Sequence, residues 1–596
     1  MLSASKMPRV LASDLDRILA ERFNLPGFRP MQREAIEAAL TGRDSLVVMP
    51  TGGGKSLCYQ LPALLLPGIT LVVSPLIALM KDQVDRLQRL DIPSIALNST
   101  LTFAQTRALV RRAQAGHIKV IFAAPERLES SPFREELASL NISLLAIDEA
   151  HCISEWGHDF RTAYRRLPDV YEAFGGDRRP PIMALTATAT PEVRTDICKL
   201  LTLDNPLEIV TGFERPNLAY GVLRESDKES RLRDILRSIG SGSAIVYAAT
   251  RKSVENITSM LRGIGVMAES YHAGVPLVLR RQVQDRYQSG QTRVIVATSA
   301  FGMGVDKPDV RAVIHYEMPG SIEAYYQEAG RAGRDGLPSH AVLFFNANDV
   351  RIQQYLIQAN SPSEADVRAV YNALHEIASN AVGSVYSGIL AVDTSQLLQD
   401  IVKPNAPIER IIEVLEQAGH VRYHRGMATD ERARIRFTAT RMRMDEVSFK
   451  SASKPVKRTI DALLRSVDAE AFEREIYLDT KSLMERHSLD GDEFKVAIRT
   501  IESLGLVKYT PAIRSRVGST TFHLTLLTER VPVHHLEFGA REMTLRLEAN
   551  LEKLDRMIRY AMEWTCRRDT ILNYFGERPK SLQCRICDVC TAKLVR

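Results

Sequence analysis

The sequence predicts an α/β protein with two parallel-sheet lobes, followed by mainly helical modules. Between residues 30 and 345, short apolar runs alternate with helical patterns, as they do in parallel sheets covered by helices. Beyond residue 360 helices dominate, and after residue 540 two helical patterns lead into a cysteine cluster. The composition fits a multidomain globular protein, because 45% of the 596 residues are hydrophobic and 25% are charged.

Eight apolar runs are expected to form the strands of the two lobes. They are residues 45–49, 69–74, 120–124, 143–148, 182–187, 243–249, 293–299 and 312–318. A stretch with Pro, Gly and Asn at residues 203–218 separates the first five runs from the last three. We therefore expect a first lobe over residues 1–210 and a second over residues 211–350, with room for a nucleotide between them.

One uncharged segment, residues 56–80, is about long enough to span a bilayer. Its prolines and glycine divide it into a helix, a strand at residues 69–73 and a turn, which is typical of a buried parallel strand. The N-terminal residues lack a signal-peptide core and include Asp14 and Asp16. We expect no membrane contact and a location in the cytoplasm, at the bacterial nucleoid, or in a eukaryotic nucleus. The net charge of +6 permits a polyanionic partner.

The helical region contains a faint internal repeat with an offset of 86 residues. The matching patterns are Asp393-Thr394-x-x-Leu397 with Asp479-Thr480-x-x-Leu483, and Leu415-Glu416-x-x-Gly419 with Ile501-Glu502-x-x-Gly505. Each copy predicts two helices, the second ended by glycine, and then two strands, with the last strand at residues 435–438 or 521–526. This is the order of a winged helix. We expect one such module over residues 360–445 and another over residues 446–532.

The first apolar run leads into a glycine-rich loop and then a helix. The loop is Thr51-Gly52-Gly53-Gly54-Lys55-Ser56. In this setting, backbone N–H groups can surround phosphates at a helix N-terminus. Lys55 is expected to reach the β and γ phosphates, and the Ser56 hydroxyl is expected to bind Mg²⁺. A plain glycine turn is the alternative for this loop taken alone.

Two further motifs complete the predicted nucleotide site. Asp148 and Glu149 end an apolar strand, where Asp148 could hold Mg²⁺ and Glu149 could polarise the attacking water. Gln327, Arg331 and Arg334 belong to the second lobe, from which arginines can stabilise the charge of a transferring γ-phosphate. The three motifs together predict an ATP site shared by both lobes.

Four of the seven cysteines form a cluster near the C-terminal end of the sequence. They are Cys566, Cys584, Cys587 and Cys590. Four thiolates at this spacing suit a tetrahedral Zn²⁺ with no open position, so the site is expected to be structural. Free core cysteines are the alternative. We expect a helical hairpin and zinc module over residues 535–596.

These motifs, in this order, resemble the RecQ family of DNA helicases over residues 23–345. The matching segments are residues 28–32, 74–83, 124–127, the DEAH box at 148–151, 186–190, 297–307 and 327–334. The resemblance implies two RecA-like ATPase lobes, with Arg29 and Gln32 at the adenine. It also implies that Asp306 lies in a motif that bridges nucleotide and DNA. The sequence around the four cysteines resembles the RecQ zinc-binding hairpin.

The segment directly after the DEAH box resembles the loop by which RecQ helicases sense single-stranded DNA. We call residues 152–161 the aromatic loop. Trp156 and Phe160 offer stacking faces, each worth roughly 1–3 kcal/mol per base, and Arg161 offers a phosphate partner. A tryptophan packed in the core is the alternative interpretation of Trp156.

The chain departs from the usual family order, because about 190 residues separate the second lobe from the zinc module. We interpret the protein as a bacterial-type variant with its zinc module at the C-terminus. Candidate DNA contacts in the intervening region, which the resemblance does not supply, are Arg410, Arg422, Arg425, Lys495, Arg499 and Lys508.

The predicted function is an ATP- and Mg²⁺-dependent DNA helicase that acts on single-stranded and duplex DNA. By resemblance it moves 3′ to 5′ and serves recombination, repair or replication. Three alternatives stay open: a translocase or remodelling ATPase without strand separation, an RNA helicase, and a DNA-binding scaffold with a vestigial motor. Protein partners are not indicated by the sequence.

Overall fold

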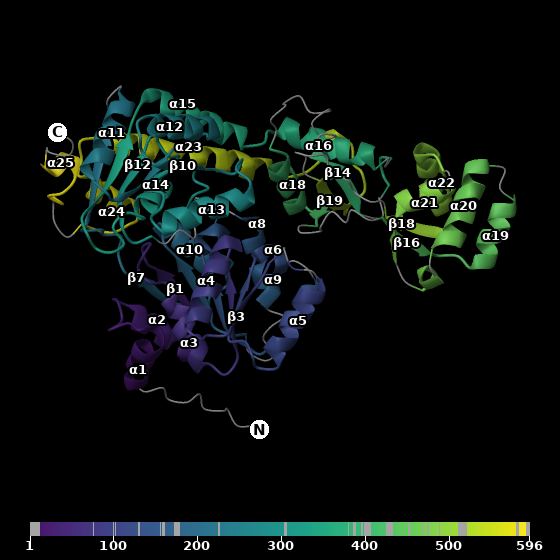
Figure 1. Cartoon of the computed structure of the whole chain (residues 1–596), viewed down its shortest axis with the longest axis horizontal. Helices are drawn as coiled ribbons and strands as arrows, with labels where there is room; N and C mark the ends of the chain where they lie inside the picture. The colour runs from purple at the N-terminus through teal and green to yellow at the C-terminus, as the bar shows by residue number, and fades with distance from the viewer. Residues whose placement is uncertain are drawn as a thin grey trace. The chain divides into compact units, whose positions relative to one another are not determined.

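The computed structural model divides the chain into two compact units (Figure 1). The first unit comprises residues 1–361 and 540–596, and the second comprises residues 362–539. The described residues are 12–75, 77–98, 101, 103–128, 131–154, 156–157, 161–171, 179–224, 227–302, 307–378, 381–384, 389–394, 397, 407–424, 433–450, 453–467, 469–473, 476–487, 489–510, 521–579 and 583–591.

The first lobe contains a seven-stranded parallel sheet in the order β3-β4-β2-β5-β6-β1-β7. Its strands are β1 (Ser45–Val48), β2 (Ile69–Val73), β3 (Ser94–Leu97), β4 (Val120–Ala123), β5 (Ile142–Ile147), β6 (Ile182–Thr186) and β7 (Leu207–Val210). All five predicted runs form strands. The two additional strands, β3 and β7, lie at the two edges of the sheet.

The helices of the first lobe follow the strands as parallel crossovers require. They are α1 (Ala12–Phe23), α2 (Gln32–Leu40), α3 (Leu57–Leu65), α4 (Ile77–Arg89), α5 (Phe103–Gln114), α6 (Pro125–Leu128), α7 (Ser131–Ala138), η1 (Ala150–Ile153), α8 (Thr162–Arg165), α9 (Leu167–Tyr171) and α10 (Pro191–Leu200). The uncharged segment at residues 56–80 contains α3, the fully buried strand β2 and the start of α4, as predicted. Among the described residues, no helix has the length and apolar character needed to cross a membrane.

The second lobe contains a six-stranded parallel sheet in the order β10-β11-β9-β12-β13-β8. Its strands are β8 (Leu218–Leu223), β9 (Ser243–Tyr247), β10 (Ala268–Tyr271), β11 (Val294–Ala297), β12 (Val310–His315) and β13 (Ser339–Phe344). Its helices are α11 (Lys228–Ser238), α12 (Arg251–Gly263), α13 (Leu277–Gln288), α14 (Ile322–Ala329) and α15 (Ala347–Ala359). The three predicted strands are β9, β11 and β12, which form the interior of this sheet together with β13.

The C-terminal residues pack onto the second lobe, and we call residues 540–591 the zinc hairpin. It contains α23 (Ala540–Met562), α24 (Arg567–Tyr574) and α25 (Asp588–Thr591). In Figure 1 the long yellow helix α23 runs along the teal second lobe. Phe575 stacks on Phe213, with ring centroids 4.3 Å apart, and the Glu577 carboxylate accepts a hydrogen bond from the Phe213 N–H. The zinc hairpin thus completes the hydrophobic core of the ATPase lobes, although residues 362–539 separate it from the second lobe in the chain.

The second unit contains two three-stranded antiparallel sheets, β14-β19-β15 and β17-β16-β18. The strands are β14 (Leu390–Asp393), β15 (Val421–Tyr423), β16 (Ala433–Phe437), β17 (Ile476–Leu478), β18 (Val507–Thr510) and β19 (Thr521–Leu526). The helices are α16 (Glu364–Ile377), α18 (Ile408–Gln417), α19 (Arg441–Lys450), α20 (Lys454–Ser466), η3 (Ala469–Phe472), α21 (Thr480–His487), α22 (Gly491–Ser503) and η4 (Val533–His535). The helices before Gly419 and Gly505 end as predicted, because both glycines adopt positive φ values, 78° and 68°.

The strand pairing corrects the tandem arrangement expected from the repeat. The repeat assigned residues 435–438 to the first module and residues 521–526 to the second. In the structure β16 pairs with β17 and β18, whereas β19 pairs with β14 and β15. Residues 433–510, which we call the inner module, therefore lie within the chain of an outer module. The identification of either module as a winged helix stays a prediction.

The two modules form separate sheets because each has its own packing. The inner module closes a separate apolar core that runs from Ala433 to Val507, in which Ile435 faces residues from α20 and α22. The outer sheet pairs Tyr423 with Leu524, so the two chain ends that lead into and out of the inner module are adjacent. An insertion is tolerated at such a position because it leaves the surrounding strand register unchanged.

Candidate functional site

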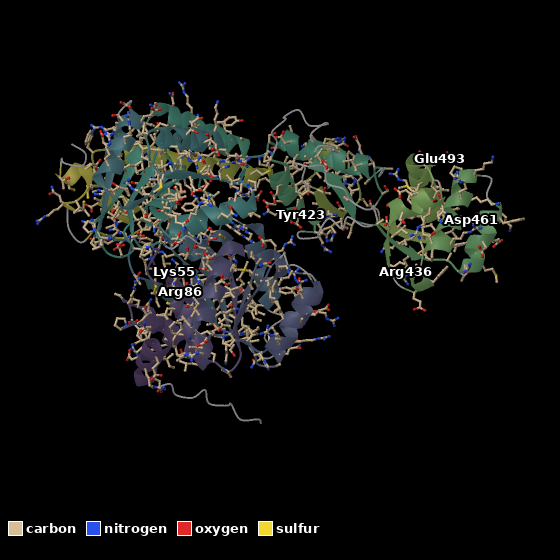
Figure 2. The ribbon with its side chains drawn as sticks, viewed as in Figure 1. Lys55, Arg86, Tyr423, Arg436, Asp461 and Glu493 are labelled. Atoms are coloured by element: carbon tan, nitrogen blue, oxygen red, sulfur yellow. The ribbon has the colours of Figure 1, made fainter. Side chains whose placement is uncertain are left out.

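The glycine-rich loop connects β1 to α3 in the conformation that phosphate binding requires. Gly52 and Gly54 both have φ of 82°, a region that side-chain-bearing residues rarely adopt. The Lys55 ammonium donates to the Met49 carbonyl at 3.0 Å. Burial lowers the pKa of Lys55, and the carboxylates of Glu149 and Asp148 oppose that shift. Figure 2 labels Lys55 in the first lobe, near the second lobe. The loop therefore combines a buried cation with glycines at the N-terminal end of α3, the elements that an anion site needs.

The two predicted acids follow β5 directly. Asp148 is tied to the sheet, because its N–H donates to the Val73 carbonyl at 2.9 Å. Burial, followed by the charge of Glu149, raises the pKa of Asp148 to about 7. Glu149 has a positive φ of 50°, a strained backbone position for a residue with a side chain. Such strain is typical of functional sites, because the surrounding fold must hold it in place.

His151 links the DEAH box to the neighbouring strand β6. Its Nδ1 atom lies 3.3 Å from the Glu149 carboxylate and 2.8 Å from the Thr186 hydroxyl. The ring is buried, so both contacts lie out of bulk water. Thr186 begins the segment 186–190, and its hydroxyl also donates to the Thr188 carbonyl. A movement of the Glu149 carboxylate can therefore be transmitted to the segment 186–190 through the His151 ring.

The predicted adenine residues contact the glycine-rich loop from α2 and the turn before it. The Gln32 amide donates to the carbonyls of Gly53 and Gly54 at 3.2 and 3.1 Å, and its oxygen accepts from the Arg29 N–H at 2.8 Å. The Arg29 guanidinium donates to the Gly52 carbonyl. Both side chains thus lie at the loop, while their role in adenine recognition stays a prediction.

The two predicted arginines of the second lobe occupy different positions. The aliphatic part of the Arg334 side chain packs against Gly52. A Cβ atom added to Gly52 would lie 3.5 Å from Cγ of Arg334. Arg331 is buried within the second lobe. Its guanidinium would lie 3.1 Å from a Cβ atom added to Gly302. Arg334 is therefore the arginine that the structure brings to the phosphate loop, and Arg331 lies against the segment 297–302.

A cavity of about 720 Å³ opens where the two lobes meet. Arg161 contributes to it from the first lobe, and Thr298, Gln327 and Arg331 contribute from the second. Of the remaining predicted residues, Thr51 and Ser56 lie in the glycine-rich loop, with the Thr51 hydroxyl 3.3 Å from the Cβ position of Gly330. Asp306 lies outside the described residues. The predicted site residues of both lobes thus converge at the interlobe cleft and at this cavity.

The aromatic loop lies beside the DEAH box, as its sequence position requires. Trp156 is 46% exposed, which excludes the interpretation of a tryptophan packed in the core. The Arg161 guanidinium donates to the Pro75 carbonyl at 3.1 Å and so contacts another of the matching segments. Phe160 lies outside the described residues. The described part of the loop therefore exposes an aromatic face at Trp156 and places the Arg161 cation at the interlobe cavity.

The four clustered cysteines converge on one point in the zinc hairpin. Their sulfur atoms all lie within 4.8 Å of one another, and each of the seven cysteines is a free thiol. Tetrahedral Zn²⁺ with thiolate ligands at roughly 2.3 Å requires sulfur separations of roughly 3.8 Å, which this cluster can supply with small shifts. The Cys587 and Cys590 N–H groups donate to the sulfur atoms of Cys584 and Cys587, respectively. The donor set and its geometry fit a structural zinc ion.

Several supporting residues carry no signal in the sequence. Arg215 donates to the carbonyls of Gly330 and Ala332 at 2.9 and 2.7 Å, and Asn217 donates to the Gly333 carbonyl at 2.7 Å. Both residues belong to the stretch 203–218, which looked like a separator between lobes. They hold the backbone that carries the two arginines. Only the polar residues within that stretch could have indicated this role.

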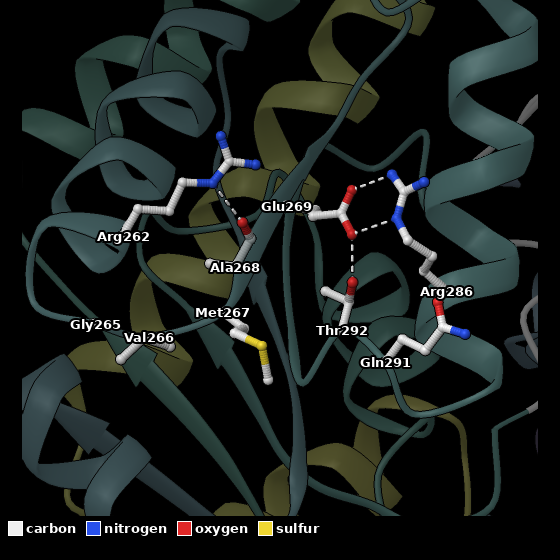
Figure 3. A pocket seen from close by; sticks show the side chains of 9 residues that line it. All are labelled: Arg262, Gly265, Val266, Met267, Ala268, Glu269, Arg286, Gln291 and Thr292. Carbon is white, nitrogen blue, oxygen red and sulfur yellow. Dashed lines mark hydrogen bonds and ion pairs between the residues drawn. The ribbon is translucent and has the colours of Figure 1, made fainter.

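A second hollow, of about 480 Å³, lies on the outer edge of the second lobe beside β10 (Figure 3). Arg286 forms a paired contact with the Glu269 carboxylate, which also accepts from Thr292, and Arg262 donates to the Ala268 carbonyl. The charged side chains of this hollow therefore bind groups of the protein itself and stabilise the edge of the sheet.

Comparisons with known proteins agree with this architecture. Residues 29–197 match the family described as DEAD/DEAH box helicase, residues 227–336 match the helicase conserved C-terminal domain, and residues 535–591 match the RecQ zinc-binding family. Two parallel-sheet lobes, a phosphate loop, a DEAH box and facing arginines define the class as a two-lobed P-loop ATPase of the helicase type.

Comparison with individual proteins indicates the family within this class. The chain is 44% identical over 348 residues to the ATP-dependent DNA helicase RecQ of Bacillus subtilis, covering 58% of each chain. It is 46% identical over 333 residues to that of Pasteurella multocida, covering 56% of this chain and 52% of the relative. It is 39% identical over 366 residues to the probable ATP-dependent DNA helicase RecS of Bacillus subtilis, covering 61% of this chain and 73% of the relative.

The chain therefore belongs to the RecQ family. It spans little more than half the length of the two RecQ relatives. Both helicase family matches fall within the first unit, and the zinc-binding match does so from residue 540 onward.

Proposed function

We propose that this protein is an ATP-dependent DNA helicase that moves 3′ to 5′ and unwinds duplex DNA in recombination, repair or replication. The observation that supports this most directly is the position of Arg334 against Gly52, because it joins the phosphate loop of one lobe to an arginine of the other. Such an activity belongs with the chromosome, in a bacterial nucleoid or a eukaryotic nucleus. The direction and the cellular role follow from the family resemblance alone.

Each residue of the cleft has a defined role in this proposal. Lys55 binds the β and γ phosphates, and the glycine N–H groups surround them. Glu149 accepts a proton from the water that attacks the γ-phosphorus, and the bond to the bridging oxygen of ADP breaks. Arg334 balances the charge that develops in the transition state, while Arg331 and Gln327 respond to closure of the lobes.

The residues at the end of β5 also fit a magnesium ion. Asp148 and Ser56 offer a carboxylate and a hydroxyl, the hard oxygen ligands that Mg²⁺ prefers. Burial, followed by the charge of Glu149, raises the pKa of Asp148, and a bound cation would offset both effects. When bound, the ion would neutralise charge on the phosphate oxygens. Lys55, Glu149 and Arg334 would then orient the nucleotide around it.

Single-stranded DNA is the proposed effector of hydrolysis. Trp156 exposes nearly half of its surface beside the DEAH box, and Arg161 places a cation at the interlobe cavity. Stacking on an aromatic face and charge pairing with phosphate are the usual means of binding single strands. The ring and the cavity thus supply a route by which a bound strand can act on Glu149.

The test is ATP hydrolysis and strand displacement by the wild type and by Lys55→Ala. Hydrolysis is measured alone and with single-stranded DNA, duplex DNA or RNA, and displacement is measured on duplexes with a 3′ or a 5′ tail. Lys199→Ala, which alters an exposed lysine of α10, serves as the control. We expect stimulation by single-stranded DNA and displacement of the 3′-tailed duplex, with both lost only in Lys55→Ala.

Other outcomes identify the alternatives. Stimulation by DNA without strand displacement would indicate a translocase or remodelling ATPase. Stimulation by RNA alone would indicate an RNA helicase, and absence of hydrolysis would indicate a binding scaffold.

A further inference from the structure

The zinc hairpin contacts the aromatic loop through one side chain. Lys553 lies in the middle of α23, and its ammonium donates to the carbonyls of Trp156 and Gly157 at 2.5 and 3.1 Å. These residues are nearly 400 positions apart in the sequence. The contact therefore joins the C-terminal hairpin to the segment that directly follows the DEAH box.

The aromatic loop is tightly packed where Lys553 binds it. A Cβ atom on Gly157 would lie 2.3 Å from the His151 carbonyl oxygen, so only glycine fits there without a backbone shift. The Trp156 N–H donates to the Ser154 hydroxyl, and that hydroxyl donates to the Asp196 carboxylate at 2.6 Å. The two carbonyls that Lys553 holds therefore belong to a segment that packs against His151 of the DEAH box.

The same face of α23, two turns beyond Lys553, packs against the helix that leads into the two arginines. The rings of Tyr560 on α23 and Tyr325 on α14 pack with their centroids 5.2 Å apart. Helix α24 of the zinc hairpin also contacts α14. Burial, followed by the charge of Glu323 at the start of α14, raises the pKa of Tyr574 in α24. Because α14 contains Gln327 and continues into Arg331, α23 connects the loop of one lobe with the arginine-bearing element of the other.

The electrostatics around Lys553 favour a fixed contact. Burial lowers the pKa of Lys553, and the nearby carboxylate of Glu323 opposes that shift while Arg546 and Arg556 add to it. An ammonium withdrawn from water gains more from carbonyl partners than an exposed one does. Lys553 thus binds two backbone carbonyls of the first lobe, and the charge of a second-lobe carboxylate favours its ammonium form.

We propose that Lys553 is a positioning residue for DNA-stimulated hydrolysis: it fixes the backbone of Trp156 and Gly157 so that the exposed Trp156 ring is presented to the DNA strand. This inference rests on the proposed helicase function and extends it to the regulation of the same site. The indole stays available for stacking because Lys553 binds only main-chain oxygens. Strand binding at Trp156 then acts on His151 through the loop and on α14 through α23.

The test uses the zinc-loaded full chain and varies the concentration of an oligo(dT) strand at saturating ATP. Lys553→Met keeps the length of the side chain but removes its donors, and Lys553→Arg keeps charge and donors. Arg559→Met is the matched control, because Arg559 is an exposed cation on the same helix that pairs with Asp555 one turn away. For Lys553→Met we expect about a tenfold rise in the oligo(dT) concentration that gives half-maximal stimulation. The rate without DNA should be unchanged, and Lys553→Arg should recover most of the effect.

A second measurement reports on the loop itself. The chain has only two tryptophans, so in a Trp564→Phe background the fluorescence of Trp156 can be followed alone. We expect Lys553→Met to weaken the oligo(dT)-dependent change in Trp156 fluorescence without ATP, by a factor similar to that in the kinetic assay. Zinc content, measured by metal analysis, should equal that of the wild type. If Lys553→Met fails to fold, Lys553→Gln allows the same two measurements.

Either of two results would overturn the proposal. A stimulation curve for Lys553→Met that coincides with that of the wild type would show that the contact does not position the loop. A higher rate without DNA would show that Lys553 restrains the loop instead of presenting it. If the wild type shows no stimulation by DNA, the proposed function fails, whereas the fluorescence titration still tests whether Lys553 positions Trp156.

Discussion

Arg567 is the residue whose removal should most weaken the zinc hairpin. Its side chain is 1% exposed, and its Nε atom lies 3.0 Å from the Asp588 carboxylate. The same guanidinium donates to the carbonyls of Tyr560 and Glu563, which end α23. Asp588 also accepts from the Val222 N–H of β8 at 2.9 Å. One buried cation thus joins two helices of the hairpin and, through its carboxylate partner, the edge strand of the second lobe.

The magnitude follows from what Arg567→Met leaves behind. Removing one partner of a buried ion pair costs about 3–5 kcal/mol, because the remaining charge keeps its desolvation penalty. The two carbonyls of α23 also lose their donor, although these losses do not add in full. At about 1.4 kcal/mol per tenfold change, the local opening equilibrium of α23 and α24 should rise by at least a hundredfold.

Hydrogen exchange measured by mass spectrometry is the appropriate assay, because a chain of two units does not unfold in a single transition. Peptides from residues 540–579 should exchange at least a hundredfold faster in Arg567→Met, while peptides from β1 and β5 should not change. Arg559→Met removes an exposed cation from α23 and should alter exchange by less than about threefold, consistent with a surface pair worth under 1 kcal/mol. Exchange in Arg567→Met within threefold of the wild type, with zinc retained, would refute the reasoning.

Three further predictions concern the zinc cluster, the inner module and pH. Cys587→Ser should lose the bound zinc, because a hydroxyl replaces a thiolate that is fully buried among the other three, and metal analysis after gel filtration checks this. Replacing residues 425–520 with a short turn should leave the outer sheet folded, because Tyr423 and Leu524 are already paired, whereas a shared core would make this variant aggregate; circular dichroism and solubility distinguish the two. Burial, with Arg530 and His420, lowers the pKa of His375 to about 4. The native state then binds fewer protons than the unfolded state between about pH 6.5 and pH 4, so stability is present above this window and is lost as pH falls through it. We expect the second unit to lose on the order of 2 kcal/mol between pH 7 and pH 5, with a smaller loss in His375→Gln, measured by urea denaturation followed through Tyr fluorescence.

The sequence predicted best those features that depend on residues close together in the chain. The glycine-rich loop, the acids after β5 and the clustered cysteines each form one local arrangement, so spacing alone indicates what they contact. The edge strands β3, β7, β8 and β10 were not predicted, because partly exposed positions interrupt their apolar runs. The interior strand β13, which begins with Ser339 and His340, was not predicted either. Arg215 and Lys553 escaped because their partners are distant backbone carbonyls, which leave no trace in local composition.

The nested arrangement of the second unit shows a different limit. An offset of 86 residues is the same whether two similar modules follow one another or one is inserted in the other. Strand pairing distinguishes the tandem arrangement from the nested one. Ile435 pairs with Ile476 and Tyr509, and both of these partners follow it in the chain. Hydrophobic spacing sets which residues are buried, but it does not determine which strand they are buried against.

The discontinuity of the ATPase unit has a consequence for how the chain folds during synthesis. Phe213, Tyr325 and Tyr326 complete their packing only against Tyr560 and Phe575 of the zinc hairpin. At roughly 5–20 residues per second, a ribosome needs on the order of 10–50 s to proceed from the end of β13 to the last cysteine. During that interval an aromatic surface of the second lobe lacks its cover. The nascent second lobe is therefore expected to depend on chaperones more than an uninterrupted ATPase would.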